Sequence, residues 1–149
     1  MFFLKELPTK AMMDQYTTGL TVDQTDAISE ALSIMRQASV LVRSIETYFS
    51  AHGLSQLRFL ILIVIDREID RDSLYPNEIA SRLDVSKPVL TRTLKKLLED
   101  GLLTANVDTI DKRAKQISLT PKGRACLLQL LPGYFNKINT LMALENAKD

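Results

Sequence analysis

The segment from Ser86 to Gly101, SKPVLTRTLKKLLEDG, constrains the fold of this chain more than any other stretch. Read at about 3.6 residues per turn, its leucines fall on one side of a helix. These leucines are Leu90, Leu94, Leu97 and Leu98. Ser86 can cap the start, and Gly101 suits the position just past the end. The pattern therefore predicts one amphipathic helix over Lys87 to Asp100, with its leucine side against a hydrophobic core.

The opposite side of this predicted helix is basic. It carries Lys87, Pro88, Thr91, Arg92 and Lys95, with Lys96 and Glu99 beside them. The acids Glu99 and Asp100 come at the end, which opposes the helix dipole and does not serve the helix's own stability. For a helix taken alone, a solvated basic face is the commoner explanation. The order of charges nevertheless suits contact with phosphate.

The neighbouring segments decide between these explanations. Pro76 opens a short predicted helix in SLYPNEIASRL, and DVS follows as a tight turn before the basic helix. A short helix, a turn and a longer helix form the helix-turn-helix order, in which the second helix enters the major groove of DNA. Next come LLTANV and KQISLT, two segments in which apolar and polar residues alternate, with the polar DTIDKRA between them. This pattern predicts a β-hairpin, or wing.

Helices are predicted on both sides of this motif. Apolar residues recur at steps of three and four from 24 to 51, which indicates a helix long enough to extend past its own core and meet a second copy. The stretch QLRFLILIVIDREI suits a strand or a buried helix, and its length and charges favour the helix. Thr120 and Pro121 restart a helix. Pro132 and Gly133 are predicted to divide that last helical region in two.

Composition and charge narrow the possible functions. The chain has 149 residues, the size of one domain, and a net charge of +1. Residues 1–75 hold 7 Lys and Arg against 10 Asp and Glu, whereas residues 76–124 hold 10 against 6. This basic middle indicates a local site for a polyanion. No apolar run approaches the roughly 20 residues of a membrane span, and no signal peptide is recognisable, so a cytoplasmic protein without membrane contact is expected.

Enzymatic chemistry lacks the residues it needs. His52 and Cys126 are the only residues of their kinds, and no glycine-rich phosphate loop is present. We therefore expect no enzyme, no metal site and no cofactor. Cys126 falls at the spacing of an apolar face, which favours a buried packing role over a redox sensor.

The chain resembles the multiple antibiotic resistance regulator (MarR) family of bacterial winged-helix repressors over about residues 24–146. PNEIASRLDVSKPVLTRTLKKLLEDGLL, the wing DTIDKR and ISLTPKG carry the resemblance. It implies a mainly α fold with a small β-hairpin wing (α+β). The implied parts are an N-terminal extension and first dimerisation helix (1–54), a winged helix-turn-helix domain (55–120) and C-terminal dimerisation helices (121–149). Two departures are Tyr75, where the family often has Thr, and Ala105, where it often has Arg.

The predicted DNA contacts come from the basic helix and the wing. They are Ser86, Lys87, Pro88, Thr91, Arg92, Lys95, Asp111, Lys112, Arg113 and Lys115. Arg and Thr can read base edges, whereas Lys more often meets phosphate. The resemblance implies that Arg113 reaches the minor groove and that Asp111 helps to hold the wing. A turn-forming aspartate is an equally good interpretation of Asp111, and Lys112 and Lys115 can serve unspecific attraction or solubility.

The predicted function is a homodimeric transcriptional regulator, a repressor by resemblance, that binds double-stranded DNA at a pseudo-palindromic operator. Kinship also implies release by a small aromatic or phenolic effector. The candidate residues for binding this effector are Arg43, Tyr48, His52 and Arg58. Each is explained equally well as a polar group of the surface or of the dimer interface. The apolar N-terminal FFLKELPTKAMMDQY is expected to pack on the partner subunit or over that pocket. The alternative function is a winged-helix module for protein contacts, because a fold does not determine a function.

Overall fold

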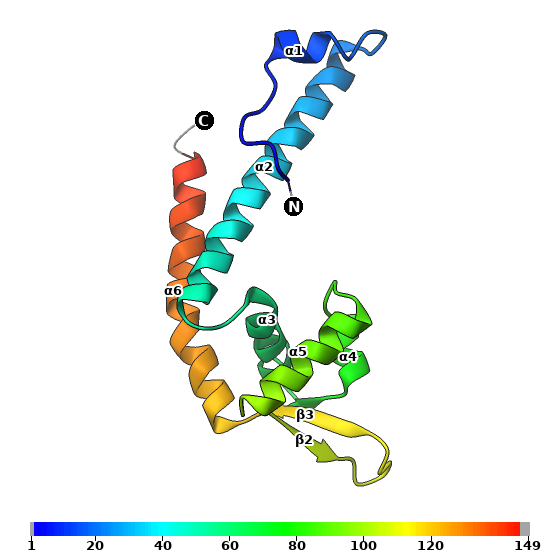
Figure 1. Cartoon of the computed structure of the whole chain (residues 1–149), viewed down its shortest axis with the longest axis vertical. Helices are drawn as coiled ribbons and strands as arrows, with labels where there is room; N and C mark the ends of the chain where they lie inside the picture. Colours follow the sequence, from blue (N-terminus) through cyan, green and yellow to red (C-terminus); the bar gives the residue numbers. More distant parts are fainter. Residues whose placement is uncertain (1, 147–149) are drawn as a thin grey trace. The chain divides into compact units, whose positions relative to one another are not determined.

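The computed structural model describes residues 2–146 of the chain (Figure 1). The chain divides into two compact units, with the boundary between Ile45 and Glu46. The first unit holds α1 (Lys10–Asp14) and most of α2 (Val22–Ala51). Thr21 and Gln24 start α2 by exchanging bonds: each backbone N–H donates to the other's side-chain oxygen, at 2.9 and 3.2 Å. This reciprocal cap explains why α2 begins two residues earlier than the apolar pattern predicts.

The segment before α2 folds back on that helix. The Ser39 hydroxyl donates to the carbonyl of Phe2 at 3.2 Å, and Met13 of α1 is buried. Thr9 caps α1, since its side-chain oxygen accepts the N–H of Met12. The N-terminal extension is thus ordered against its own chain, while Phe3 and Tyr16 remain largely exposed.

The second unit contains the sheet and the remaining helices. They are α3 (Gln56–Asp66), β1 (Ser73–Leu74), α4 (Pro76–Ser81), α5 (Lys87–Glu99), β2 (Leu103–Val107), β3 (Lys115–Leu119) and α6 (Pro121–Asn146). The sheet is antiparallel with strand order β1-β3-β2. Leu103 pairs with Leu119 and Val107 with Lys115, while Ser73 pairs with Ser118 at the other edge. The predicted fold class, mainly α with a small β-hairpin wing, is confirmed.

The core of this unit surrounds α3. Its largest fully buried side chains are Phe49, Phe59, Ile61, Leu62, Ile65, Leu74, Ile79, Leu97 and Leu127. The ring of Phe59 lies 4.5 Å from Phe49 and 4.9 Å from Tyr134, so α2, α3 and α6 share one aromatic cluster. Burial on nearly all sides explains why the α3 sequence is too apolar to show a helical stripe. The helical interpretation of this ambiguous stretch is confirmed.

The predicted helix ends are also found. Gly53 and Gly101 have φ values of 70° and 72°, in the left-handed region that glycine tolerates best. Ser55 caps α3 by accepting the N–H of Arg58 at 3.2 Å. Strand β1 was not predicted, because two residues are too few to show an alternating pattern.

The predicted division of the last helical region at Pro132 and Gly133 is wrong. α6 continues through Pro132 from Pro121 to Asn146. A proline removes one backbone donor, whereas packing acts over the whole helix. The Tyr48 hydroxyl donates to the carbonyl of Leu130 at 2.8 Å, and the Tyr48 ring lies so close to Gly133 that a Cβ there would collide with it. The end of α2 therefore supports α6 at the point where the sequence alone predicts a break.

Among the described residues, no single helix is long and apolar enough to cross a membrane, although α2 and α3 reach that length and composition together as a bent pair.

Candidate nucleic-acid interface

Helix α5 is held in the second unit by its leucines. Leu90, Leu94 and Leu97 are buried and Leu98 is half-buried, as the spacing predicts. The opposite face carries Lys87, Pro88, Thr91, Arg92 and Lys95, and all five side chains are exposed. The hydrophobic contact of one face thus directs the cationic side chains of the other into solvent.

Ser86 stands at the N-cap position of α5 but makes no side-chain cap bond. The prediction that its hydroxyl caps the helix is therefore wrong. Pro88 at the second helical position has no N–H to donate, and the Ser86 hydroxyl does not accept the N–H of Val89 at the third position either. The exposed hydroxyl of Ser86 is left to face the same solvent as Lys87.

The C-terminal end of α5 is tied to two other helices through Asp100. Its carboxylate pairs with Arg58 of α3 and with Lys96, the latter at 2.9 Å, and its carbonyl accepts from Lys122 of α6 at 2.8 Å. The hydrogen bond from Lys96 is the main reason that the pKa of Asp100 lies below its usual range. Asp100 therefore gathers three cations at the position where the negative end of the helix dipole also favours them.

Helix α4 is anchored at its start by Glu78. This carboxylate accepts the backbone N–H of Tyr75 at 2.8 Å and pairs with Arg71 at 2.5 Å. The pKa of Glu78 is lowered, mainly by the hydrogen bond from Arg71 and next by the one from the Tyr75 backbone. Ile79 is fully buried beneath the same turn. Tyr75 at the N-cap makes no side-chain cap bond, so the reciprocal bond from its backbone N–H to Glu78 holds the start of the helix.

The turn of the wing is built around two aspartates. Asp108 accepts the N–H groups of Ile110 and Asp111 at 2.6 and 3.1 Å, and Asp111 accepts that of Arg113 at 3.0 Å. The backbone N–H of Asp108 also donates to the carbonyl of Ala114 at 3.0 Å. Asp111 therefore does form the turn, and its bond holds the backbone of Arg113. The side chains of Lys112 and Arg113 are exposed.

Asp108 also accepts a hydrogen bond from the hydroxyl of Tyr75, 33 residues earlier in the chain. Gln116 of β3 donates to both groups at 3.0 Å, and Ser73 of β1 donates to Gln116 at 2.8 Å. The bond from Tyr75, with the two backbone bonds of the turn, lowers the pKa of Asp108 to about 2. Sequence reasoning missed this network, because only the departure of Tyr75 from the expected Thr signalled it and nothing local identifies its partner.

A groove of about 770 Å³ separates α5 from the wing. Lys87 and Thr91 of α5 line one side, Arg113 and Lys115 of the wing line the other, and Tyr75 with Asn77 lies between them. The hydroxyl of Thr91 donates to the carbonyl of Lys87 at 2.9 Å, which leaves its oxygen able to accept a further bond. The fold thus brings four of the predicted DNA contacts, from two separate segments, to one concave surface.

Two other predicted contacts lie elsewhere. Arg92 and Lys95 line a hollow of about 590 Å³ together with Ser55, Arg58 and Lys96. Lys95 and Glu99 approach to 3.9 Å, but both are exposed, so this pair contributes little to stability. The cationic surface of α5 therefore extends past the groove toward the start of α3.

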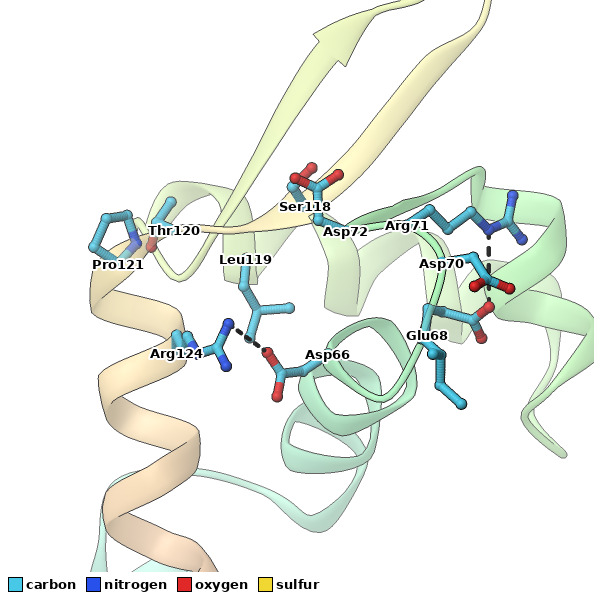
Figure 2. A pocket seen from close by; sticks show the side chains of 11 residues that line it. Asp66, Glu68, Asp70, Arg71, Asp72, Ser118, Leu119, Thr120, Pro121 and Arg124 are labelled. Carbon is cyan, nitrogen blue, oxygen red and sulfur yellow. Dashed lines mark ion pairs between the residues drawn. The ribbon is translucent and has the colours of Figure 1, made fainter.

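Another hollow is lined by more acids than bases. Figure 2 shows Asp66, Glu68, Asp70 and Asp72 around a space of about 830 Å³ beside the start of α6. Arg124 approaches Asp66 to 3.7 Å and Arg71 approaches Glu68 to 3.8 Å, so part of this charge is compensated (Figure 2). Acids in excess make this surface unsuited to phosphate. The described residues form no cluster that could hold a metal ion.

The four residues predicted to bind an effector lie in α2, in α3 and in the turn between these helices. Arg43 is exposed on the first unit's part of α2. In the second unit, the His52 ring contacts that of Tyr48 at a tilt of 48° with ring centres 4.5 Å apart, and its Nδ1 lies 2.8 Å from the Tyr48 carbonyl oxygen. Arg58 pairs with Asp100. Their role toward an effector stays a prediction.

Known proteins resemble both the fold and the sequence. The DNA complex of Sco3205, a MarR-family regulator from Streptomyces coelicolor, matches with a TM-score of 0.71 and 17% identity over 82% of this chain and 75% of that one. Residues 52–114 match the profile of the MarR family. The transcriptional repressor YetL of Bacillus subtilis is 34% identical over 146 residues, covering 98% of this chain and 86% of YetL. The chain belongs to the MarR family.

The MarR-family match begins just after α2 and ends at the turn of the wing, so it includes α5 and most residues of the groove. A further solved structure, the transcriptional regulator MosR of M. tuberculosis in complex with DNA, is 28% identical with a TM-score of 0.58 over 80% of this chain and 81% of MosR. The predicted family is confirmed. This MarR-family chain is a DNA-binding transcriptional regulator with a winged helix.

Proposed function

We propose that this MarR-family regulator is a homodimeric repressor whose two α5 helices enter successive major grooves of a pseudo-palindromic operator. The observation that carries the proposal is the single groove in which Lys87 and Thr91 of α5 face Arg113 and Lys115 of the wing. A recognition helix and a wing that flank one concave cationic surface can contact adjacent grooves of one duplex. In a dimer, the two helices would stand about one DNA turn apart, ~34 Å.

Each cation has a role that follows from its chemistry. Arg92 is exposed on α5 and can pair with a guanine edge, while Thr91 offers a methyl and an oxygen to a base. Lys87, Lys95 and the hydroxyl of Ser86 contact phosphates, which set the register of the helix. Pro88 packs against the same stretch of the DNA sugar–phosphate backbone. Arg113 enters the minor groove from the wing, and Lys112 and Lys115 add unspecific attraction.

Exposed apolar side chains support the dimer. Ile28, Ile34, Met35 and Val42 are exposed on α2, and Phe135, Met142 and Leu144 are exposed on α6. So many exposed apolar side chains on two long helices indicate that another protein surface buries them. A second copy, with residues 1–54 and 121–149 as its dimerisation segments, is the proposed cover. Phe3, Met12 and Tyr16 of the N-terminal extension would add to this interface.

An aromatic or phenolic effector is proposed at Arg43, Tyr48, His52 and Arg58. In the second unit, Arg58 would pair with its acid group, and the rings of Tyr48 and His52 would pack against its aromatic ring. Arg58 is the link to DNA binding, because its pairing with Asp100 joins the start of α3 to the end of α5. A ligand that drew Arg58 away from Asp100 would bias the position of α5. We place the protein in the cytoplasm, where its operator is.

Binding to the DNA upstream of its own gene tests the proposal. Fluorescence anisotropy at about 50 and 200 mM salt compares this DNA with a scrambled duplex. We expect tight, salt-sensitive binding to the upstream DNA, and a loss of about 1–3 kcal/mol in Arg92→Ala and in Arg113→Ala. Arg67→Ala is the matched control, since Arg67 is exposed at the end of α3, outside α5 and the wing.

Equal binding of both duplexes would contradict the proposal and favour the alternative, a winged-helix module for protein contacts. Sedimentation of the free protein tests the dimer separately, and a monomer at micromolar concentration would contradict it. Addition of benzoate or phenol to the bound complex tests the effector class. Release that is retained in Arg43→Ala and Arg58→Ala would remove these residues from the effector site.

A further inference from the structure

The wing turn, residues 108–114, depends on one side chain from outside the wing. Val107, beside the turn, and Ile110, within it, are exposed, so neither side chain anchors the turn in a hydrophobic core. Among the described residues, its hydrogen bonds and ion pairs lie within the wing, except the bond from Tyr75 to Asp108. Tyr75 therefore supplies the polar contact between the turn that carries Arg113 and the helix-turn-helix.

Tyr75 is itself rigidly placed. Its backbone N–H donates to Glu78, whose carboxylate is paired with Arg71, and its neighbours Leu74 and Ile79 are fully buried. Because its backbone is fixed in this way, the Tyr75 side chain can hold the wing turn at a defined place relative to α4. The alternative of a flexible surface tyrosine that happens to meet the wing does not fit these contacts.

The partners of the Tyr75 hydroxyl fix which group donates and which accepts in each hydrogen bond of the network. Ser73 donates to the amide oxygen of Gln116, which directs the Gln116 NH2 group toward Tyr75 and Asp108. The Tyr75 hydroxyl donates its hydrogen to Asp108, and its oxygen accepts from the Gln116 amide. The second oxygen of Asp108 is occupied by the backbone of the turn. A network whose members are all satisfied specifies a single geometry.

We propose that Tyr75 is a positioning residue for DNA binding, whose bond to Asp108 sets the wing turn at the spacing from α5 that lets Arg113 and α5 contact the same duplex. The proposal rests on the proposed role of Arg113 as a DNA contact. Tyr75 also lines the groove that the two contact segments share. It acts through the position of Arg113 and needs no contact with DNA of its own.

Tyr75→Phe tests the proposal, because it removes the hydroxyl and keeps the ring. We expect the dissociation constant for the operator to rise about tenfold, the size of effect for a lost hydrogen bond to a charged group. In an Arg113→Ala background the same change should alter affinity less than about twofold, since the wing no longer contributes. Tyr134→Phe is the matched control, which deletes a phenol oxygen in the aromatic cluster and leaves operator affinity unchanged.

Amide hydrogen exchange supplies a readout that does not need DNA. The N–H groups of Ile110, Asp111 and Ala114 should exchange faster in Tyr75→Phe, while those of α3 and α6 keep their wild-type rates. Unchanged exchange in the wing, or a tenfold loss of affinity that persists in Arg113→Ala, overturns the proposal. If the wild type does not select its operator, the proposed function fails, and the exchange experiment still decides whether Tyr75 holds the wing.

Discussion

Gly123 in the first turn of α6 packs directly on the carbonyl of Leu102, so that a Cβ atom added at Gly123 would collide with backbone. The same carbonyl accepts the N–H of Thr120 at 3.1 Å, and the Thr120 hydroxyl donates to the carbonyl of Gly101 at 2.6 Å. The start of α6 is therefore joined to the chain between the recognition helix α5 and the first wing strand β2. The absence of a side chain at Gly123 is what permits this approach.

Gly123→Ala should destabilise the protein although alanine favours a helix. Helix propensity alone would stabilise the variant by about 1 kcal/mol. Overpacking typically costs about 1–3 kcal/mol or more, and here the obstacle is backbone, which cannot rotate aside. We expect a net loss in the free energy of unfolding, measured by urea denaturation. Gln129→Ala, at an exposed position of the same helix, is the control. A stabilised Gly123→Ala protein would show that the close approach is absent in solution.

Ser86→Ala should separate stability from DNA binding. Because the Ser86 hydroxyl makes no cap bond, its loss should change the free energy of unfolding by less than about 0.5 kcal/mol. Operator affinity should fall, since the proposed phosphate contact is removed. Ser55→Ala is the matched control, because Ser55 does cap α3 and its loss should cost about 1 kcal/mol. Thermal and urea unfolding of both variants check this. A Ser86→Ala protein as destabilised as Ser55→Ala would contradict the structure.

The Asp108 carboxyl should titrate near pH 2, below its ordinary value of 3.8. A carboxylate with a lowered folded pKa contributes stability above its unfolded pKa, and that contribution is lost as the pH falls from about 3.8 through about 2. The wing contact should therefore persist unchanged from pH 8 to pH 5. The ¹³C shift of the Asp108 carboxyl measures the titration.

Tyr75→Phe should raise the pKa of Asp108 toward its ordinary value, because the bond from Tyr75 is the largest cause of the shift. The two backbone bonds of the turn should keep it somewhat below 3.8. The same NMR titration on the variant checks this. An identical midpoint in both proteins would mean that the phenol does not donate to Asp108 in solution.

Pro132→Ala should stabilise α6. Proline in a helix interior costs up to about 3 kcal/mol relative to alanine, and the exposed Pro132 side chain makes no core contact that alanine would lose. We expect a higher free energy of unfolding and greater helicity by circular dichroism. A destabilised variant would instead mean that the assembled protein requires a local bend at Pro132, for which a dimer interface is the natural reason.

Local chemistry made much of the candidate site predictable. The leucine spacing of α5 identified its buried face, and with it the exposed stripe of Lys87, Thr91, Arg92 and Lys95. Gly101 and the alternating strands after it predicted the hairpin, and the acid-and-arginine turn predicted its tip. Each of these inferences uses neighbours within a few residues, whose relative positions are set by the helix or strand itself.

The tertiary structure decided what depends on residues far apart in the chain. The partner of Tyr75 is 33 residues away, and that of Arg58 is 42 residues away. The sequence pattern at Pro132 predicts a break, and support from Tyr48 of α2, which bonds to Leu130, favours continuity. By itself, the sequence determined which face of α5 is apolar and which is cationic. Which distant polar groups meet was decided only when the core brought those elements together, because a side chain's hydrogen-bond partner depends on the path of the whole chain and not on periodicity.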